Sequence, residues 1–191
     1  MAALAQVPRE LFLPPRYRHL AYEDRAVEIG LGQSCSQPWV VALVIEALAL
    51  EPGSSVLEVG VGSGYLAAVL RGAGAAKVVG LELLPYLAAR ARSNLNRAGI
   101  EGVVVLARDG AQGATPWAPY DAVVVSAAAD AVPEPVRGQL KQGGRLVIPL
   151  RERAGERLWC LTREADGWSR RDLGECRFVP LRGATAGGAP P

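Results

Sequence analysis

The sequence predicts an α/β domain built on a doubly wound, mainly parallel sheet. Strand-like and helix-like segments alternate through the middle of the chain, which is typical of a parallel sheet with helices on both faces. A buried-type strand at 56–59 runs directly into a glycine-rich turn and then into an apolar helix. With 191 residues, of which 50% are hydrophobic and 21% charged, the chain is long enough for one domain with a sizeable core.

Nine core elements follow from apolar periodicity and from the residues that begin and end helices. The first helix has apolar residues at helical spacing and is ended by Glu51-Pro52-Gly53. A later helix has Pro85 in its first turn and Gly99 just past its end, the usual placement of these two residues. The predicted order is helix 38–50, strand 56–59, helix 64–70, strand 77–81, helix 85–98, strand 103–107, strand 120–126, helix 133–142 and strand 145–150.

The C-terminal part of the chain predicts an antiparallel strand pair. Its two strands are expected at 157–163 and 177–181, with a polar connection around Asp166-Gly167. The tail 183–191 contains mainly Gly, Ala and Pro and is expected to be disordered. A single domain is therefore expected over 1–182, with an N-terminal segment 1–37, a core 38–150 and C-terminal strands 151–182.

Composition argues against several classes of protein. A net charge of +2 without long charged blocks does not favour nucleic-acid binding. The longest apolar run, 39–50, is too short to span a membrane, and no leader pattern is visible, so a cytoplasmic location is expected. Three cysteines without C-x-x-C spacing predict neither a disulfide framework nor a zinc site. The single histidine, His19, removes most histidine-based metal and triad chemistry, so no metal is expected.

The glycine-rich turn indicates which kind of ligand the domain binds. Gly60, Gly62 and Gly64 follow the pattern G-x-G-x-G, whereas a dinucleotide fingerprint needs a glycine where Tyr65 stands. No Gly-Lys-Ser/Thr follows, which excludes a Walker loop. The turn therefore favours a nucleoside ligand without a pyrophosphate.

Two further strand ends support a nucleoside site. Glu82 follows the turn by about 20 residues, where an acidic side chain accepts hydrogen bonds from ribose hydroxyls. Asp109 follows the next strand and is a candidate acceptor for an adenine amino group, with Gly110 allowing the backbone to approach the ring. Taken singly, Glu82 also fits a solvated charge at a helix start, and Asp109 fits a turn residue.

Together these features resemble the site of Rossmann-like S-adenosylmethionine-dependent methyltransferases. The resemblance implies S-adenosyl-L-methionine as cofactor and S-adenosyl-L-homocysteine as product. Candidate cofactor-binding residues are Glu58, Val59, Gly60, Gly62, Ser63, Gly64, Tyr65, Glu82, Leu83, Asp109 and Gly110.

Motifs that are absent from the sequence exclude some classes of methyl acceptor. Amino-methylating DNA enzymes carry an Asp/Asn-Pro-Pro-aromatic tetrad after the fourth strand, but residues 126–130 read Ser-Ala-Ala-Ala-Asp. No carboxylate cluster of a metal-dependent catechol-type enzyme is visible. An acceptor that is already ionised at neutral pH remains, and a carboxylate fits because its pKa is near 4.

Segments outside the methyltransferase core carry a more specific resemblance. Val7-Pro8-Arg9-Glu10-Leu11-Phe12, Ala21-Tyr22-Glu23-Asp24, residues 29–38 and Arg177-Phe178-Val179-Pro180-Leu181 closely resemble the protein-L-isoaspartate O-methyltransferase family, from about Val7 to Leu181. The resemblance implies methylation of the free α-carboxylate of isoaspartyl residues, which lets a succinimide re-form and repairs damaged proteins and peptides. It places Ser36 in the active site, the segment 1–37 on the substrate side, and Ser34, Gln37, Val179 and Pro180 against the substrate.

The expected role of Ser36 is orientation of the acceptor. A hydroxyl that donates to one carboxylate oxygen leaves the other aimed at the methyl group. Trp39, Val179 and Pro180 are expected to shield this pocket from water. The alternative for Ser36 is an N-cap of the helix that begins at Pro38, and the alternative for Val179-Pro180 is an edge strand.

Two departures from the family pattern matter. Cys35 stands where the family usually has isoleucine, and it is read as a packing residue by default. Family members usually carry a further helical segment before Val-Pro-Arg, which helps to cover the cofactor, whereas only six residues precede that motif here. Three consequences are considered: the cofactor binds more weakly, a partner or a second copy covers it, or the start codon has been assigned too late.

Three other functions stay open at this point. One is methylation of another peptide carboxylate by the same lineage, and another is a non-catalytic S-adenosylmethionine-binding module. An NAD-dependent dehydrogenase is disfavoured by Tyr65. A monomer is expected, with self-association left open.

Overall fold

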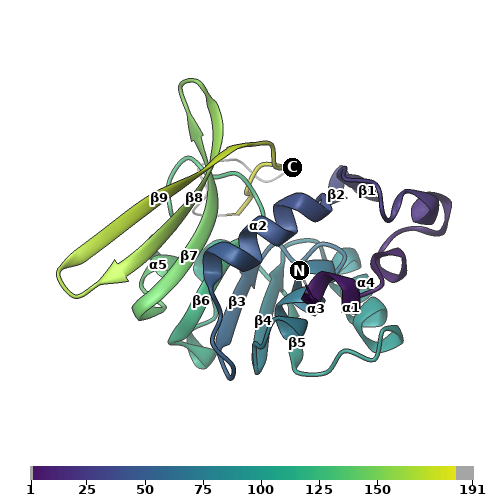
Figure 1. Ribbon diagram of the computed structural model, residues 1–191, viewed down its shortest axis with the longest axis horizontal. Helices are drawn as coiled ribbons and strands as arrows, with labels where there is room; N and C mark the ends of the chain where they lie inside the picture. Colours follow the sequence, from purple (N-terminus) through teal and green to yellow (C-terminus); the bar gives the residue numbers. More distant parts are fainter. Residues whose placement is uncertain (1, 184–191) are drawn as a thin grey trace.

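The computed structural model describes residues 2–183 and has the predicted α/β architecture. A seven-stranded sheet has the order β5-β4-β3-β6-β7-β8-β9, in which β5 to β7 are parallel neighbours and the last two strands are antiparallel (Figure 1). A separate two-stranded sheet, β1-β2, lies near the N-terminus. The strands are β1 Val27–Gly30, β2 Gln33–Cys35, β3 Ser55–Val59, β4 Lys77–Glu82, β5 Val103–Ala107, β6 Tyr120–Val125, β7 Leu140–Glu152, β8 Gly155–Glu164 and β9 Gly167–Cys176.

Helices cover both faces of the sheet, as a doubly wound fold requires. One face packs against α2, α3 and α4, and the other packs against α5 and short 3-10 turns. The α-helices are α1 Ala2–Gln6, α2 Pro38–Leu48, α3 Tyr65–Gly72, α4 Pro85–Arg97 and α5 Glu134–Arg137. The 3-10 helices are η1 Arg9–Phe12, η2 Pro15–Leu20, η3 Gly110–Gln112 and η4 Thr115–Trp117.

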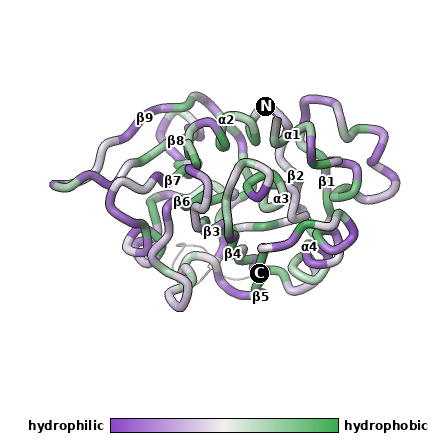
Figure 2. Tube along the Cα trace, turned by 60° about the horizontal axis from the view of Figure 1, so that its bottom comes forward, coloured by the Kyte–Doolittle hydropathy of each residue, from purple (hydrophilic) through white to green (hydrophobic). Residues whose placement is uncertain are grey.

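Apolar side chains of the central strands form the two halves of the core. Val56 and Val78 belong to the half under α3 and α4, while Leu57 and Val79 face the other side, and all four are fully buried. This is the alternation expected of strands covered on both faces. Figure 2 shows hydrophobic residues concentrated in the centre, whereas the outer strand β9 is largely hydrophilic.

Two predicted elements are wrong. The helix expected at 133–142 is only one turn long, because the chain from Leu140 onward joins the sheet and pairs with Tyr120 in β6. Strand β7 consequently starts at Leu140 instead of 145. The predicted strand at 177–181 is also wrong, since the partner of β8 is β9, and Asp166 lies in the tight turn between them.

The structure adds elements that the sequence did not predict in the first 37 residues. These are α1, η1, η2 and the hairpin β1-β2. The tail predicted at 183–191 lies outside the described residues except for Gly183. Within residues 2–183, no helix is long and apolar enough to cross a membrane.

Candidate active site

A pocket lies where β3, β4 and β6 end, beside the point at which the strand order reverses. This is where open α/β sheets bind ligands. Its lining includes most of the predicted site residues: Ser34, Ser36, Glu58, Val59, Gly60, Gly62, Ser63, Tyr65, Glu82, Leu83, Gly110, Val179 and Pro180. Gly64, Gln37, Asp109 and the expected shield Trp39 are not among the lining residues, and Trp39 is 54% exposed.

The glycine turn has a backbone that only glycine adopts readily. Gly60, Gly62 and Gly64 have φ of +86°, +56° and +88°. Gly64 also packs against α4, because a Cβ there would lie 3.3 Å from the carbonyl oxygen of Ala91. The three glycines therefore form a tight bend, whose backbone lines the pocket at Gly60 and Gly62.

Glu82 fixes this bend from the neighbouring strand. Its Oε2 accepts a hydrogen bond from the Gly62 amide at 2.8 Å, and its Oε1 accepts one from the Leu84 amide at 3.0 Å. The side chain is only 7% exposed and lines the pocket. Since each carboxylate oxygen has two lone pairs, Glu82 retains capacity for the hydroxyls of a ligand.

Glu58 is a buried carboxyl with unused hydrogen-bonding capacity. It is 1% exposed, and its Oε2 has no hydrogen-bond partner among the residues described. Burial, followed by the nearby charge of Glu82, raises the pKa of Glu58 well above its ordinary value of 4.5. An unsatisfied buried carboxyl on the pocket wall fits a ligand that brings a cationic or hydrogen-bond-donating group.

Asp109 is a turn residue, which was the alternative to its predicted role as an acceptor for the adenine amino group. Its Oδ1 accepts from the Ala111 amide at 2.9 Å and caps η3. Gly110 does line the pocket, and it must be glycine because a Cβ would lie 2.5 Å from Val59 Cγ1. The backbone at Gly110 therefore approaches the pocket as expected, while the carboxylate of Asp109 does not line it.

Ser36 is not the N-cap of α2. The cap position is Gln37, whose side chain makes no capping bond, and the Asp24 carboxylate accepts from the Trp39 amide at 2.9 Å instead. Because Asp24 does the capping, the Ser36 hydroxyl is not committed to the helix. It lies on the pocket wall, in the extended segment between β2 and α2.

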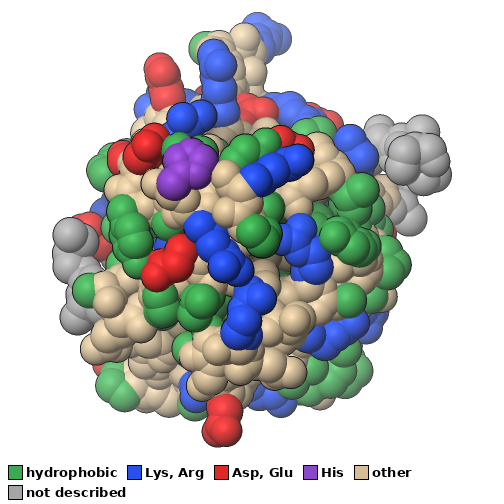
Figure 3. Space-filling model, turned by 90° about the vertical axis from the view of Figure 1, so that its right-hand side faces the viewer, with side chains coloured by type: hydrophobic (Ala, Val, Ile, Leu, Met, Phe, Trp, Pro, Cys, Tyr) green, Lys and Arg blue, Asp and Glu red, His purple; other side chains and the backbone are tan. Residues whose placement is uncertain are grey.

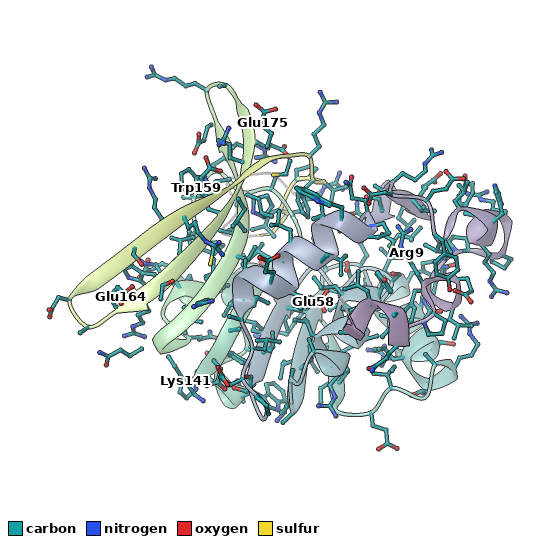
Figure 4. All side chains as sticks on the ribbon, in the orientation of Figure 1. Arg9, Glu58, Lys141, Trp159, Glu164 and Glu175 are labelled. Atoms are coloured by element: carbon teal, nitrogen blue, oxygen red, sulfur yellow. The ribbon has the colours of Figure 1, made fainter. Side chains whose placement is uncertain are left out.

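Arg9 is a site residue that sequence reasoning missed as such. Although cationic, it is 1% exposed, and it lies on η1 in the N-terminal part of the chain (Figure 4). Its guanidinium donates to the carbonyl oxygens of Ala21 at 2.8 Å, Ser36 at 2.9 Å and Arg25 at 3.0 Å. Arg9 thus ties the segment that carries Ser36 to the connection between η2 and β1, and its only signal in the sequence was the Val-Pro-Arg motif.

The segment with Val179 and Pro180 reaches the pocket through the loop after β6. The Ala128 amide donates to the Val179 carbonyl, and the Leu181 amide donates to the Ala128 carbonyl, both at 2.8 Å. This segment therefore lies across the loop that follows β6. The alternative that Val179-Pro180 form an edge strand is wrong, because their one strand-like pairing is an isolated bridge between Ala128 and Pro180.

Two further titratable side chains of the pocket, Cys35 and Tyr65, hold their protons. Burial raises the pKa of the Cys35 thiol, and it raises the pKa of Tyr65 to about 12. His19 is exposed and does not line the pocket. Among residues 2–183 there is also no group of three or more His, Cys, Asp or Glu that could hold a metal ion.

Comparisons with known proteins agree on one family. The family model described as "Protein-L-isoaspartate(D-aspartate) O-methyltransferase (PCMT)" matches residues 1–186. A protein-L-isoaspartate O-methyltransferase from Methanoculleus marisnigri is 48% identical over 183 residues, covering 96% of this chain and 83% of its own length. Protein-L-isoaspartate O-methyltransferase 2 from Marinobacter nauticus is 47% identical, with 96% and 84% covered.

Solved structures give the same result. A protein-L-isoaspartate O-methyltransferase structure superposes with a TM-score of 0.85 and 31% identity, over 97% of this chain and 63% of its own. A Plasmodium falciparum structure described as a beta-aspartate methyltransferase (PCMT), in complex with S-adenosyl-L-homocysteine, has a TM-score of 0.80 and 27% identity, over 94% and 88%.

Proposed function

The chain belongs to the protein-L-isoaspartate(D-aspartate) O-methyltransferase family, and on that premise we propose that it methylates the free α-carboxylate of L-isoaspartyl residues in damaged proteins and peptides. S-adenosyl-L-methionine supplies an electrophilic methyl group on a sulfonium, and its transfer to a carboxylate oxygen leaves a methyl ester and S-adenosyl-L-homocysteine without any proton transfer. The ester primes succinimide formation and so initiates repair.

The residues around the glycine turn fit this cofactor. Gly60 and Gly62 offer an open backbone, Glu82 offers oxygens for ribose hydroxyls, and Gly110 leaves room for a flat ring. The unpartnered Oε2 of Glu58 can accept a hydrogen bond from an amino group of the cofactor, either directly or through water. We assign the remaining predicted contacts to Val59, Ser63, Tyr65 and Leu83, which line the pocket. Gly64 instead packs the turn against α4, and Asp109 supports the turn at Gly110.

The observation that carries the proposal is that Ser36 opens onto the same pocket as the glycine turn, with its hydroxyl released from helix capping. In our proposal this hydroxyl donates to one oxygen of the isoaspartyl carboxylate and leaves the other oxygen aimed at the methyl group. Ser34, Val179 and Pro180 contact the surrounding peptide, whereas Gln37 does not line the pocket and stands at the N-cap of α2. Three unpaired cysteines support work in a reducing compartment such as the cytoplasm.

The test is transfer of labelled methyl from S-adenosylmethionine to two peptides that differ only in isoaspartyl against normal aspartyl at one position. Base-labile label is expected in the isoaspartyl peptide alone. Ser36→Ala should lower kcat/KM by about 10- to 100-fold, the cost of one hydrogen bond to a charged group, and leave cofactor affinity unchanged. Ser36→Thr keeps the hydroxyl and is the matched control. Cofactor binding by calorimetry without transfer to either peptide would contradict the proposal and favour another acceptor.

A further inference from the structure

A second groove lies on the outer side of the β1-β2 hairpin, between this hairpin, η2 and α4. Its volume is about 820 Å³. Four arginines line it, Arg16, Arg18, Arg90 and Arg97, and no aspartate or glutamate is among its described lining residues. Figure 3 looks onto this end of the molecule and shows a band of Lys and Arg side chains beside apolar ones. We call it the arginine groove.

The positive charge of the arginine groove is a local feature. The whole chain has 21 basic and 19 acidic residues, so its charges nearly balance. Arg16 has only a loose ion pair with Glu28 at 3.9 Å, between side chains that are 66% and 54% exposed. Arg18 is exposed and forms no ion pair within the described chain. These two cations are therefore available to an external anion.

The other two arginines are held in place but keep free donors. Arg90 donates to the Ile29 carbonyl at 2.9 Å, and Arg97 donates to the Leu11 carbonyl and to Asn94 Oδ1. A guanidinium has five N–H donors, so most of them remain available. Fixed guanidinium groups bind carboxylates at a low entropic cost because their donors are already oriented.

Apolar side chains complete the groove. Leu31 and Tyr86 are 58% and 59% exposed, and both line it. Leu31 is at the tip of the hairpin with φ of +55°, a backbone conformation that is strained for a side chain of this kind. Strain of this kind is typical of ligand clamps, and here it presents a large apolar side chain at the groove's edge.

The hairpin separates the arginine groove from the pocket. Ser34 of β2 and Ser36 line the pocket, whereas Leu31 lines the groove. The five steps along the chain from Leu31 to Ser36 span at most about 17 Å, at about 3.3 Å per residue. An extended peptide needs about five residues to cross the same distance.

We propose that the arginine groove binds an acidic segment of the substrate polypeptide, about five residues along the chain from the methylated residue. This inference rests on the proposed function. Carboxylates of the segment pair with Arg16 and Arg18 and with the free donors of Arg90 and Arg97, while its apolar side chains contact Leu31 and Tyr86. The groove thereby favours isoaspartyl sites that have acidic residues nearby in the sequence.

The experiment compares isoaspartyl peptides that carry four glutamates or four glutamines, centred five residues from the isoaspartyl residue on its N-terminal or its C-terminal side. On one side, the glutamate peptide is expected to have a KM about fivefold lower than its glutamine counterpart, with kcat unchanged, since several exposed ion pairs contribute together. The difference should shrink at high salt.

Two double variants locate the effect. Arg16→Glu with Arg18→Glu should abolish the glutamate preference and leave KM for the glutamine peptide unchanged. Arg153→Glu with Arg170→Glu makes the same change in net charge on exposed residues of the β7-β8 turn and β9, at the other end of the molecule (Figure 1), and should keep the preference.

Three outcomes would overturn the inference. Equal KM values for glutamate and glutamine peptides on both sides would do so, and so would loss of the preference in both double variants. Anionic phospholipid vesicles binding the wild type but not the groove variant, without a glutamate effect, would assign the groove to a membrane surface instead. Absence of transfer to every isoaspartyl peptide would overturn the proposed function itself.

Discussion

Replacement of Arg9 by lysine should impair catalysis through Ser36. Arg9 makes three hydrogen bonds of 2.8 to 3.0 Å to backbone carbonyls of two separate segments, the connection between η2 and β1 and the segment that carries Ser36. Lysine keeps the positive charge, but its single nitrogen lacks the planar fork and cannot reach all three oxygens. The segment that carries Ser36 therefore loses a restraint, while the charge near the pocket is conserved.

The magnitude follows from these bonds. A hydrogen bond to a charged group contributes about 1.5–3 kcal/mol, so losing one or two of the three should cost about 2–4 kcal/mol in the free energy of unfolding. A displacement of Ser36 by about 1 Å is expected to lower kcat/KM by about 100-fold. The loss should be mainly in kcat, because none of these hydrogen bonds of Arg9 goes to the glycine turn that we propose binds the cofactor, and lysine keeps the positive charge beside the ring of Tyr65.

The assay is a double-mutant cycle between Arg9→Lys and Ser36→Ala, with kcat/KM for an isoaspartyl peptide and urea denaturation measured on all four proteins. If Arg9 acts by placing the Ser36 hydroxyl, its replacement costs little once that hydroxyl is gone, and the coupling should exceed about 1 kcal/mol. Arg92→Lys is the control, since Arg92 also donates to a carbonyl, that of Val105 at 2.9 Å, away from the pocket. Additive losses, with a coupling below about 0.5 kcal/mol, would refute the reasoning.

Three further predictions concern the pocket. Gly62→Val should abolish cofactor binding in calorimetry, because Gly62 has φ of +56° and its Cβ would lie 3.3 Å from Ile29 Cδ1; unchanged affinity would show that the turn tolerates side chains. The pKa of Glu58 is raised in the fold, so its contribution to stability is complete below its ordinary value of 4.5 and is lost as the pH rises through the raised pKa. Glu58→Gln should remove this pH-dependent loss of stability. The free energies of unfolding of variant and wild type, measured by urea denaturation, should therefore diverge as the pH rises. A constant difference between the two proteins at every pH would contradict the raised pKa. Burial raises the pKa of the Cys35, Cys160 and Cys176 thiols, in the last case to about 11. None of the three should therefore react quickly with a disulfide reagent at pH 8 until urea unfolds the protein. Rapid reaction of the native protein would show that one of them is an accessible thiolate.

The parallel core was predictable because its elements carry their own signals. Strand β5 has the predicted bounds, and β3 and β4 differ from prediction by one residue at one end. Strands buried on both faces are continuous apolar runs between turn residues, so each is visible without knowledge of its neighbours. The glycine turn was predictable for a related reason, since three positive φ angles in five residues leave little choice of residue type.

The errors arose where distant contacts decide the local structure. The sequence from Pro133 has helix signals, yet the chain leaves the helix at Gly138 because the Gln139 carbonyl accepts from the Tyr120 amide and Leu140 joins β6. Strand β9 is an edge strand with many exposed residues, so it lacks the apolar alternation by which strands are recognised. Its one local signal, Asp166-Gly167, was noticed as a connection but not as a tight hairpin turn.

In the site, too, residues with a local signal were predictable and residues whose roles depend on distant contacts were not. Glu82 was predictable from its spacing after the turn, but the roles of Asp24 and Arg9 depend on contacts across many residues: Asp24 caps a helix that begins at Pro38, and Arg9 bonds to the Ser36 carbonyl. A buried arginine also contradicts the usual expectation for charged residues. Burial is tolerable here because backbone carbonyls accept from both terminal nitrogens of the guanidinium, although its Nε has no partner among the described residues, and no local spacing encodes this pattern.

The titratable groups of the pocket decide which acceptors it can serve. Cys35 and Tyr65 are protonated at neutral pH because burial raises both pKa values, and both oxygens of Glu82 already accept hydrogen bonds. Glu58 has a spare oxygen, but in our proposal this oxygen accepts from an amino group of the cofactor. An amine or alcohol must lose a proton when it is methylated, and among the described lining residues none is placed to take that proton and release it. A carboxylate arrives already ionised, so it needs only orientation, which is the role that we propose for the Ser36 hydroxyl.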